Sequence, residues 1–315
     1  MESCFSKKLQ PSDGRELLSL LQKQLEPRIR DHTFLIALQG VKMVGVSDAK
    51  LGSMLVVDSA ERHIERAKLP QPEKEIGWVW KALKGHACLV GTFRGTFDAA
   101  RRKFSQQAHL TAGLLAVAAG YTYDRGATTF CSWGSGFGSH QQFEIDDARR
   151  QELTGAGVWN YAFHILGKTK MSDVEEAINR AVYWYGDAHR DPVAVMQFVK
   201  YWSCIECFFS LGDAEVTESL ALGVSTVLTF GHFPLYERGN YAATRASVKS
   251  LYSKRSRAVH GASHEHVRAG DLVLLSQWAA LVIVNMISFA HADLPTRRIL
   301  FERLKRIDFD ECARA

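Results

Sequence analysis

The chain of 315 residues has few cysteines and few prolines. Its six cysteines are scattered along the whole length, which excludes the dense disulfide framework of small secreted proteins and favours a reducing compartment. Seven prolines and 24 glycines are too few for a collagen-like or low-complexity chain. The first eight residues contain no apolar run of the kind found in a signal peptide. We therefore expect a cytoplasmic protein.

The pattern of apolar residues changes near residue 170, and the length suits two domains. Before this point, short strand-like runs alternate with helical segments, and the runs cover residues 34–38, 41–46, 54–57, 88–93 and 128–133. After it, the pattern is helical to the end. We expect an α+β domain over residues 1–165, an all-α bundle over residues 171–294 and a C-terminal tail over residues 295–315.

The second half predicts five helices joined by short loops, which is typical of an up-and-down bundle. The first begins at Ser172-Asp-Val-Glu175, which has the form of a capping box. The five expected ranges are 172–189, 192–209, 213–229, 240–257 and 271–292.

The last of these helices contains a run of 21 uncharged residues, from Leu272 to Ala292. Such a run is long enough to cross a bilayer, but a helix that is apolar all round is also what the centre of a soluble bundle requires. Polar residues such as Ser276 and Asn285 lie inside it, and we expect no second membrane span elsewhere in the chain. We expect a buried helix and no membrane partner.

The net charge of +5 is small, but it is unevenly distributed. Residues 1–170 carry 23 Lys and Arg against 17 Asp and Glu, whereas residues 171–315 carry 16 against 17. Within the second half, the stretch 238–264 has six basic residues and no acidic one. Such a stretch is either a solvated helix face or a site for a polyanion such as RNA. In the second case, the RNA-binding residues are Arg245, Lys249 and Lys254.

Two metal-ligating patterns have ordinary structural explanations. Cys204-x-x-Cys207 lies inside an aromatic helix without a second ligand pair, so core packing is the better interpretation. The histidines near the end of the basic stretch lack a carboxylate or thiol pattern that would complete a site; they are His260, His264 and His266. We expect no metal and no cofactor.

The end of the fourth predicted helix combines Arg255, Ser256, Arg257 and His260. Arginine binds phosphate in a bidentate fork, and histidine can take or give a proton near neutral pH. These two groups suffice in kind for metal-independent RNA cleavage, which needs a base for the ribose 2′-hydroxyl, a cation on the phosphorane and an acid for the leaving 5′-oxygen. One chain supplies one such histidine, so this chemistry predicts a homodimer. Alternatively, Arg255 and His260 simply stabilise a helix C-terminus, where cations are favoured.

The spacing Arg255-x4-His260, in the setting Leu-Tyr-x-x-Arg-Ser-x-x-Val-His-Gly, resembles the signature of HEPN domains, in particular the Apea-like group. Residues 181–188 and 198–209 resemble the two earlier helices of that group. The likeness covers residues 172–292, and residues 1–165 do not share it.

The resemblance implies a dimeric all-α bundle with a metal-independent endoribonuclease site, in antiviral defence or in a toxin or stress system with an antitoxin or other defence protein as partner. Arg255 would bind the scissile phosphate and His260 would act as acid and base. Ser256 stands where many members have a stronger polar residue, and some members only bind. The alternative is therefore a catalytically inactive HEPN-fold dimer that binds nucleic acid or a protein.

Glu206 lies inside an apolar helix, where a carboxylate needs a partner. We expect it to contact a motif cation, Arg255 or Arg257. The aromatic residues of the same helix are expected to lie in the bundle core or a dimer interface; they are Tyr201, Trp202, Phe208 and Phe209.

The first half carries a basic run, Arg101-Arg-Lys103, near Trp78, Trp80 and Phe104. Basic residues beside aromatic ones are compatible with RNA contact. The short strands around residues 84–91 are compatible with a small OB-like barrel.

Overall fold

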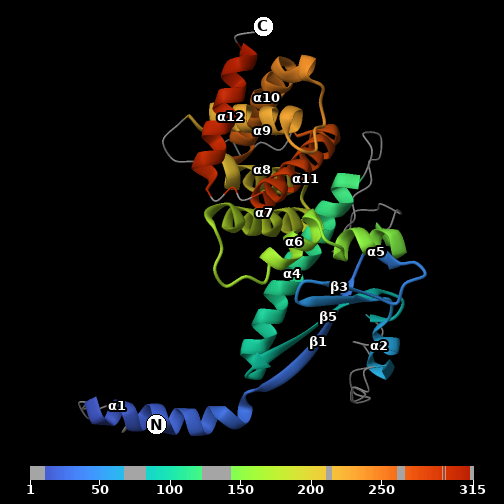
Figure 1. The fold of residues 1–315 in the computed structure, drawn as a ribbon, viewed down its shortest axis with the longest axis vertical. Coiled ribbons are helices and arrows are strands. Elements are labelled where there is room, and N and C mark those ends of the chain that lie inside the picture. The colour runs from blue at the N-terminus through green and yellow to red at the C-terminus, as the bar shows by residue number, and fades with distance from the viewer. Residues whose placement is uncertain are drawn as a thin grey trace.

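A computed structural model describes residues 11–66, 83–122, 143–210, 215–260, 267–292, 294 and 296–312. A small β-sheet with its helices forms the first part of the chain, and a larger group of helices follows (Figure 1). This arrangement agrees with the expected order of an α+β region before an all-α region. The chain begins with α1 (Pro11–Leu25), which projects from the body, and a 3-10 turn, η2 (Glu26–Arg28).

The sheet has four antiparallel strands in the order β1-β5-β4-β3. They are β1 (Arg30–Leu38), β3 (Asp48–Leu51), β4 (Met54–Val57) and β5 (Ala87–Gly95). Gly52 makes the tight turn between β3 and β4 at φ +58°, and a Cβ there would lie 2.5 Å from the carbonyl oxygen of Phe163. Only glycine suits this turn, because other residues resist positive φ and would meet that carbonyl.

The strand predictions over 34–38, 54–57 and 88–93 fall within β1, β4 and β5, whereas 41–46 shortens to β2 (Val41–Met43). β2 pairs in parallel with β6 (Phe143–Ile145) in a separate two-stranded sheet. The run 128–133 lies outside the described residues. The expected OB-like barrel is wrong for the described strands, because the larger sheet is open, with β1 and β3 as its two edges.

Helix α4 (Phe97–Thr122) connects the sheet to the helical part (Figure 1). Phe104 near its start stacks on Phe34 of β1, with ring centroids 5.2 Å apart. Farther along, Gly113 lies against α7 (Asp173–Arg190), where a Cβ would come within 2.6 Å of the carbonyl oxygen of Val182. One contiguous hydrophobic core therefore includes residues on both sides of position 165.

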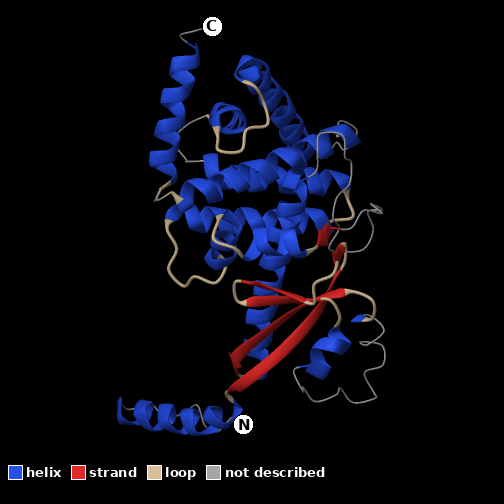
Figure 2. Ribbon diagram, turned by 45° about the vertical axis from the view of Figure 1, so that its right-hand side comes forward, coloured by secondary structure: helices blue, strands red, loops and turns tan. Residues whose placement is uncertain are grey.

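The helical part contains the five helices predicted from the sequence (Figure 2). They are α7 (Asp173–Arg190), α8 (Ala194–Phe209), α9 (Val216–Phe230), α10 (Tyr241–His260) and α11 (Ala269–His291). The predicted capping box is confirmed, since the Ser172 hydroxyl accepts from the Glu175 N–H and the Glu175 carboxylate accepts from the Ser172 N–H. The described residues also form four shorter elements in other parts of the chain: α2 (Ala60–Arg66), α5 (Asp147–Thr154), α6 (Val158–Ile165) and η4 (Arg238–Asn240).

Helix α11 is the one helix of the described residues that is long and apolar enough to cross a membrane. Of its most apolar 18-residue stretch, 72% is buried inside the protein. Its Asn285 side chain is fully buried and bonds both the N–H and the carbonyl of Phe233, at 3.0 and 3.1 Å. The helix is buried among other helices, as the sequence predicted.

The segment 295–315 is not simply a tail, because it contains α12 (Arg297–Cys312). Leu300, Phe301 and Leu304 are buried, and the helix packs against α9. The backbone N–H of Arg297 also donates to Asp173 Oδ2 at 2.8 Å. These three apolar residues are spaced i, i+1 and i+4, so they lie on one face of the helix, and this face packs on the bundle.

Candidate functional site

Arg255 lies on the side of α10 that faces α8, where it meets Glu206. Its Nη2 is 3.2 Å from Glu206 Oε1 and 3.3 Å from Oε2. The Tyr252 hydroxyl donates to Glu206 Oε1 at 3.0 Å, and the Arg255 guanidinium carbon lies 5.8 Å from the Tyr252 ring centroid. The predicted contact between Glu206 and a motif arginine is confirmed. We call Arg255, Glu206 and Tyr252 the Arg255 cluster.

The Arg255 cluster is half-buried, with 22% of the Arg255 side chain and 19% of the Glu206 side chain exposed. Burial, and next the charge of Glu206, raise the pKa of Tyr252 to about 12, so its hydroxyl stays protonated and acts as a donor. The ion pair uses Nη2 of Arg255, so Nη1 is not part of it. The cluster therefore fixes one guanidinium near the end of α10.

The other motif residues lie on the last turns of α10. Ser256 and Arg257 are exposed, and His260 is the last residue of the helix, with its side chain outside the described residues. His264 and His266 also lie outside them. Because successive residues of an α-helix turn by about 100°, positions 255 and 260 point about 140° apart around the axis. The two motif residues of one chain therefore do not face the same direction on the helix.

The three cations expected to bind RNA are all engaged in ion pairs. Lys249 Nζ is 2.5 Å from Glu218, and Lys254 Nζ is 2.7 Å from Asp271. Arg245 lies 2.6 Å from Asp308 and 3.3 Å from Glu218. The stretch 238–264 has no acid in sequence, but α9, α11 and α12 bring carboxylates to it in space. A phosphate would have to compete with these internal partners.

The Cys204-x-x-Cys207 pair is part of the helix packing, as predicted. Cys204 Sγ donates to the Lys200 carbonyl at 3.2 Å, and Cys207 Sγ donates to the Ser203 carbonyl at 3.1 Å. Burial raises the pKa of both thiols, that of Cys207 to about 11, so neither is an activated thiolate. The aromatic residues of α8 are buried, and no group of three or more potential metal ligands occurs among the described residues.

Comparisons with protein-family models, with curated proteins and with solved structures all found no match. The resemblance to HEPN domains thus depends on the residues of α7, α8 and α10.

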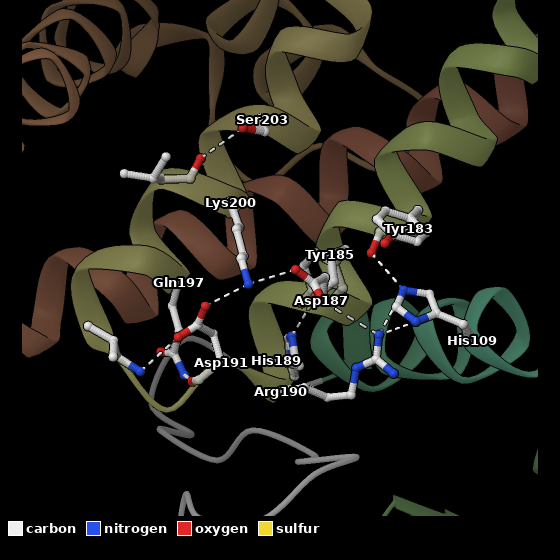
Figure 3. Close-up of polar contacts among 12 residues, drawn as sticks. His109, Tyr183, Tyr185, Asp187, His189, Arg190, Asp191, Gln197, Lys200 and Ser203 are labelled. Atoms are coloured by element: carbon white, nitrogen blue, oxygen red, sulfur yellow. Dashed lines mark hydrogen bonds and ion pairs between the residues drawn. The ribbon is translucent and has the colours of Figure 1, made fainter. Parts of the chain in front are cut away.

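A second polar cluster was not predicted from the sequence, and it joins α4, α7 and α8 (Figure 3). Lys200 Nζ lies 2.6 Å from both Asp187 and Asp191. The His109 ring stacks on Tyr183 with centroids 4.4 Å apart, and its Nε2 is 3.2 Å from the Tyr183 carbonyl. Arg190 Nη2 contacts His109 Nδ1. The charges at the end of α7 were visible in the sequence, but nothing there indicated that α4 crosses α7 at His109.

Of the aromatic residues expected beside the basic run of the first half, the structure describes only Phe104. Phe104 is only 5% exposed because it packs against the sheet. Trp78 and Trp80 lie outside the described residues. Arg101, Arg102 and Lys103 are exposed on the first turns of α4.

Proposed function

We propose that this protein is a metal-independent endoribonuclease of HEPN type that works as a homodimer. The observation that supports the proposal best is the Arg255 cluster, in which Glu206 and Tyr252 fix the first residue of the Arg-x4-His spacing. A guanidinium that is always charged and has a fixed position suits a phosphorane, on which negative charge develops during cleavage.

In this proposal, Arg255 binds the scissile phosphate through N–H groups not used by Glu206. A His260 accepts the proton of the ribose 2′-hydroxyl, and a second His260 donates a proton to the leaving 5′-oxygen, so that a 2′,3′-cyclic phosphate forms. The angular separation of positions 255 and 260 is consistent with a site composed from two chains. Ser256 and Arg257, exposed on the same turn, would support the RNA backbone. We place the protein in the cytoplasm, in a defence or toxin-type system.

The second candidate is a catalytically inactive HEPN-fold dimer that binds nucleic acid or a protein such as an antitoxin. The ion pairs of Arg245, Lys249 and Lys254 favour it, because they leave less free positive charge around α10. In this case, the Arg255 cluster only connects α10 to α8.

Cleavage of single-stranded RNA in excess EDTA tests the two candidates. We expect the wild type to leave 2′,3′-cyclic phosphate ends, and Arg255→Ala and His260→Ala to lose this activity while light scattering shows intact dimers. Arg255→Lys keeps the charge without the bidentate fork and should retain only part of the activity. Arg298→Ala, at an exposed position of α12, is the matched arginine control. Wild-type rates in both alanine variants would exclude this site.

A further inference from the structure

The first turns of α4 carry three exposed basic residues and one acid, Asp98. From Ala99 to Thr122 the helix has no Asp or Glu, and Arg101, Arg102 and Lys103 are all exposed. None of the three takes part in an ion pair between described residues, in contrast to Arg245, Lys249 and Lys254. Free cations on a surface attract polyanions more strongly than cations that are already paired.

Two large aromatic side chains lie exposed farther along the same side of α4. Tyr183 of α7 is 46% exposed and Trp184 is 36% exposed, with ring centroids 5.8 Å apart in an edge-on arrangement. One face of the Tyr183 ring is covered by His109 of α4. A stacked and thus oriented ring that remains half exposed is suited to stack a nucleic-acid base.

His109 connects the aromatic pair to the arginines. Arg102 precedes it by seven residues, which is about 10 Å along the helix and about 20° around it, so both positions share a face of α4. Burial, and next the charge of Arg190, lower the pKa of His109, so the ring stacks as a neutral group.

Arg190 adds a cation beside the rings (Figure 3). Its carboxylate neighbour, Asp187, is 3.7 Å away, whereas the same carboxylate lies 2.6 Å from Lys200. Lys200 is shared between Asp187 and Asp191, so Arg190 is only weakly paired with Asp187, and its side chain is 36% exposed at the surface.

We infer that this surface, formed by Arg101, Arg102, His109, Tyr183, Trp184 and Arg190 and called here the α4–α7 face, binds single-stranded RNA. Tyr183 stacks a base, and Arg101 and Arg102 contact phosphates about two helical turns away. The inference rests on the proposed function in that it identifies where the substrate of the ribonuclease is bound. Exposed cations on the same surface as exposed rings favour a single strand, because the bases of a duplex are not free to stack.

Fluorescence anisotropy with a labelled 12-nucleotide RNA tests the inference, using full-length His260→Ala so that no RNA is cut. Added to this background, Tyr183→Ala should weaken binding roughly 5- to 100-fold, and Tyr183→Phe should restore it, because the ring rather than the hydroxyl stacks. The double change Arg101→Ala and Arg102→Ala should reduce the slope of log Kd against log salt by about 1.4, at about 0.7 for each lost phosphate contact. The matched control removes two exposed arginines of α12, Arg298 and Arg306.

Several outcomes would overturn the inference. One is unchanged RNA binding in Tyr183→Ala and in the α4 double variant. In that case the α4–α7 face does not bind RNA, and a protein is the alternative ligand. Equal losses of RNA affinity in the α4 and α12 double variants would show nonspecific electrostatic binding rather than a defined site. Duplex RNA binding as tightly as the single strand would show the same. Failure of the proposed function is distinguishable from failure of this inference. RNA binding that depends on Tyr183, together with no RNA cleavage by the wild type, would refute the ribonuclease but support the RNA-binding face.

Discussion

The ion pair between Arg255 and Glu206 should contribute measurably to stability, and a double-mutant cycle can determine how much. We consider Glu206→Gln, which keeps an acceptor for the Tyr252 hydroxyl but removes the negative charge 3.2 Å from Arg255. The second variant is Arg255→Met, which keeps the length of the side chain, and the third combines both changes.

The magnitude follows from the burial of the pair. Fully exposed pairs contribute about 0.2–1 kcal/mol, and removing one partner of a fully buried pair costs about 3–5 kcal/mol. With roughly a fifth of each side chain exposed, at 22% and 19%, the cost of Glu206→Gln should lie between these limits, at about 1–3 kcal/mol. In a chain of this length, about 2 °C of Tm is lost for each kcal/mol, so we expect a decrease of about 2–6 °C.

Thermal unfolding followed by circular dichroism, together with urea unfolding, would measure the three variants against wild type. The coupling energy should be at least about 0.5 kcal/mol, because the two residues are in direct contact. If the double variant loses only the sum of the two single losses, Arg255 and Glu206 do not interact in solution, and our description of the Arg255 cluster is incorrect. A normal coupling energy together with no RNA cleavage by the wild type would support the inactive dimer.

Three further changes test other parts of the structure. Burial lowers the pKa of His189 to about 4, so the unfolded chain binds a proton that the folded chain excludes, and the free energy of unfolding should decrease as pH falls from about 6.5 towards 4. In urea titrations at several pH values, His189→Gln should reduce the slope of this free energy against pH, and an unchanged slope would refute the role of His189. Gly186→Ala places a Cβ 2.8 Å from the Gly113 Cα and should cost about 1–3 kcal/mol, whereas Gly270→Ala, with nothing within 4 Å, should not destabilise; equal stabilities would contradict the close approach of α4 and α7. Leu304→Ala should cost about 2–5 kcal/mol because the side chain is 3% exposed, whereas Ile299→Ala, at 43% exposed, should stay within about 0.5 kcal/mol; a harmless Leu304→Ala would mean that α12 is not docked.

The sequence predicted the helices of the second half well, because their signals are local. Ser172 and Glu175 are three residues apart and form one cap, and Gly231 directly follows the last turn of α9. The contact of Glu206 with a motif arginine, Arg255 or Arg257, was also predictable, since a carboxylate in an apolar helix needs a partner.

Long-range contacts account for what the sequence did not predict. Lys249, Lys254 and Arg245 appeared unpaired because their partners, Glu218, Asp271 and Asp308, come from three other helices. The contact with α7 at Gly113 involves residues about 70 positions away, so no local pattern indicated it.

Helix α4 has a consequence for how the protein unfolds. One end of this single helix belongs to the sheet and the other is packed among α7 and α11, so separation of the two parts would expose apolar surface on both. Sheet and bundle should therefore lose their structure in one cooperative transition, and protease should not release a folded fragment beginning near residue 170. The boundary visible in the amino-acid pattern is not a place where the molecule can be divided into two independent modules.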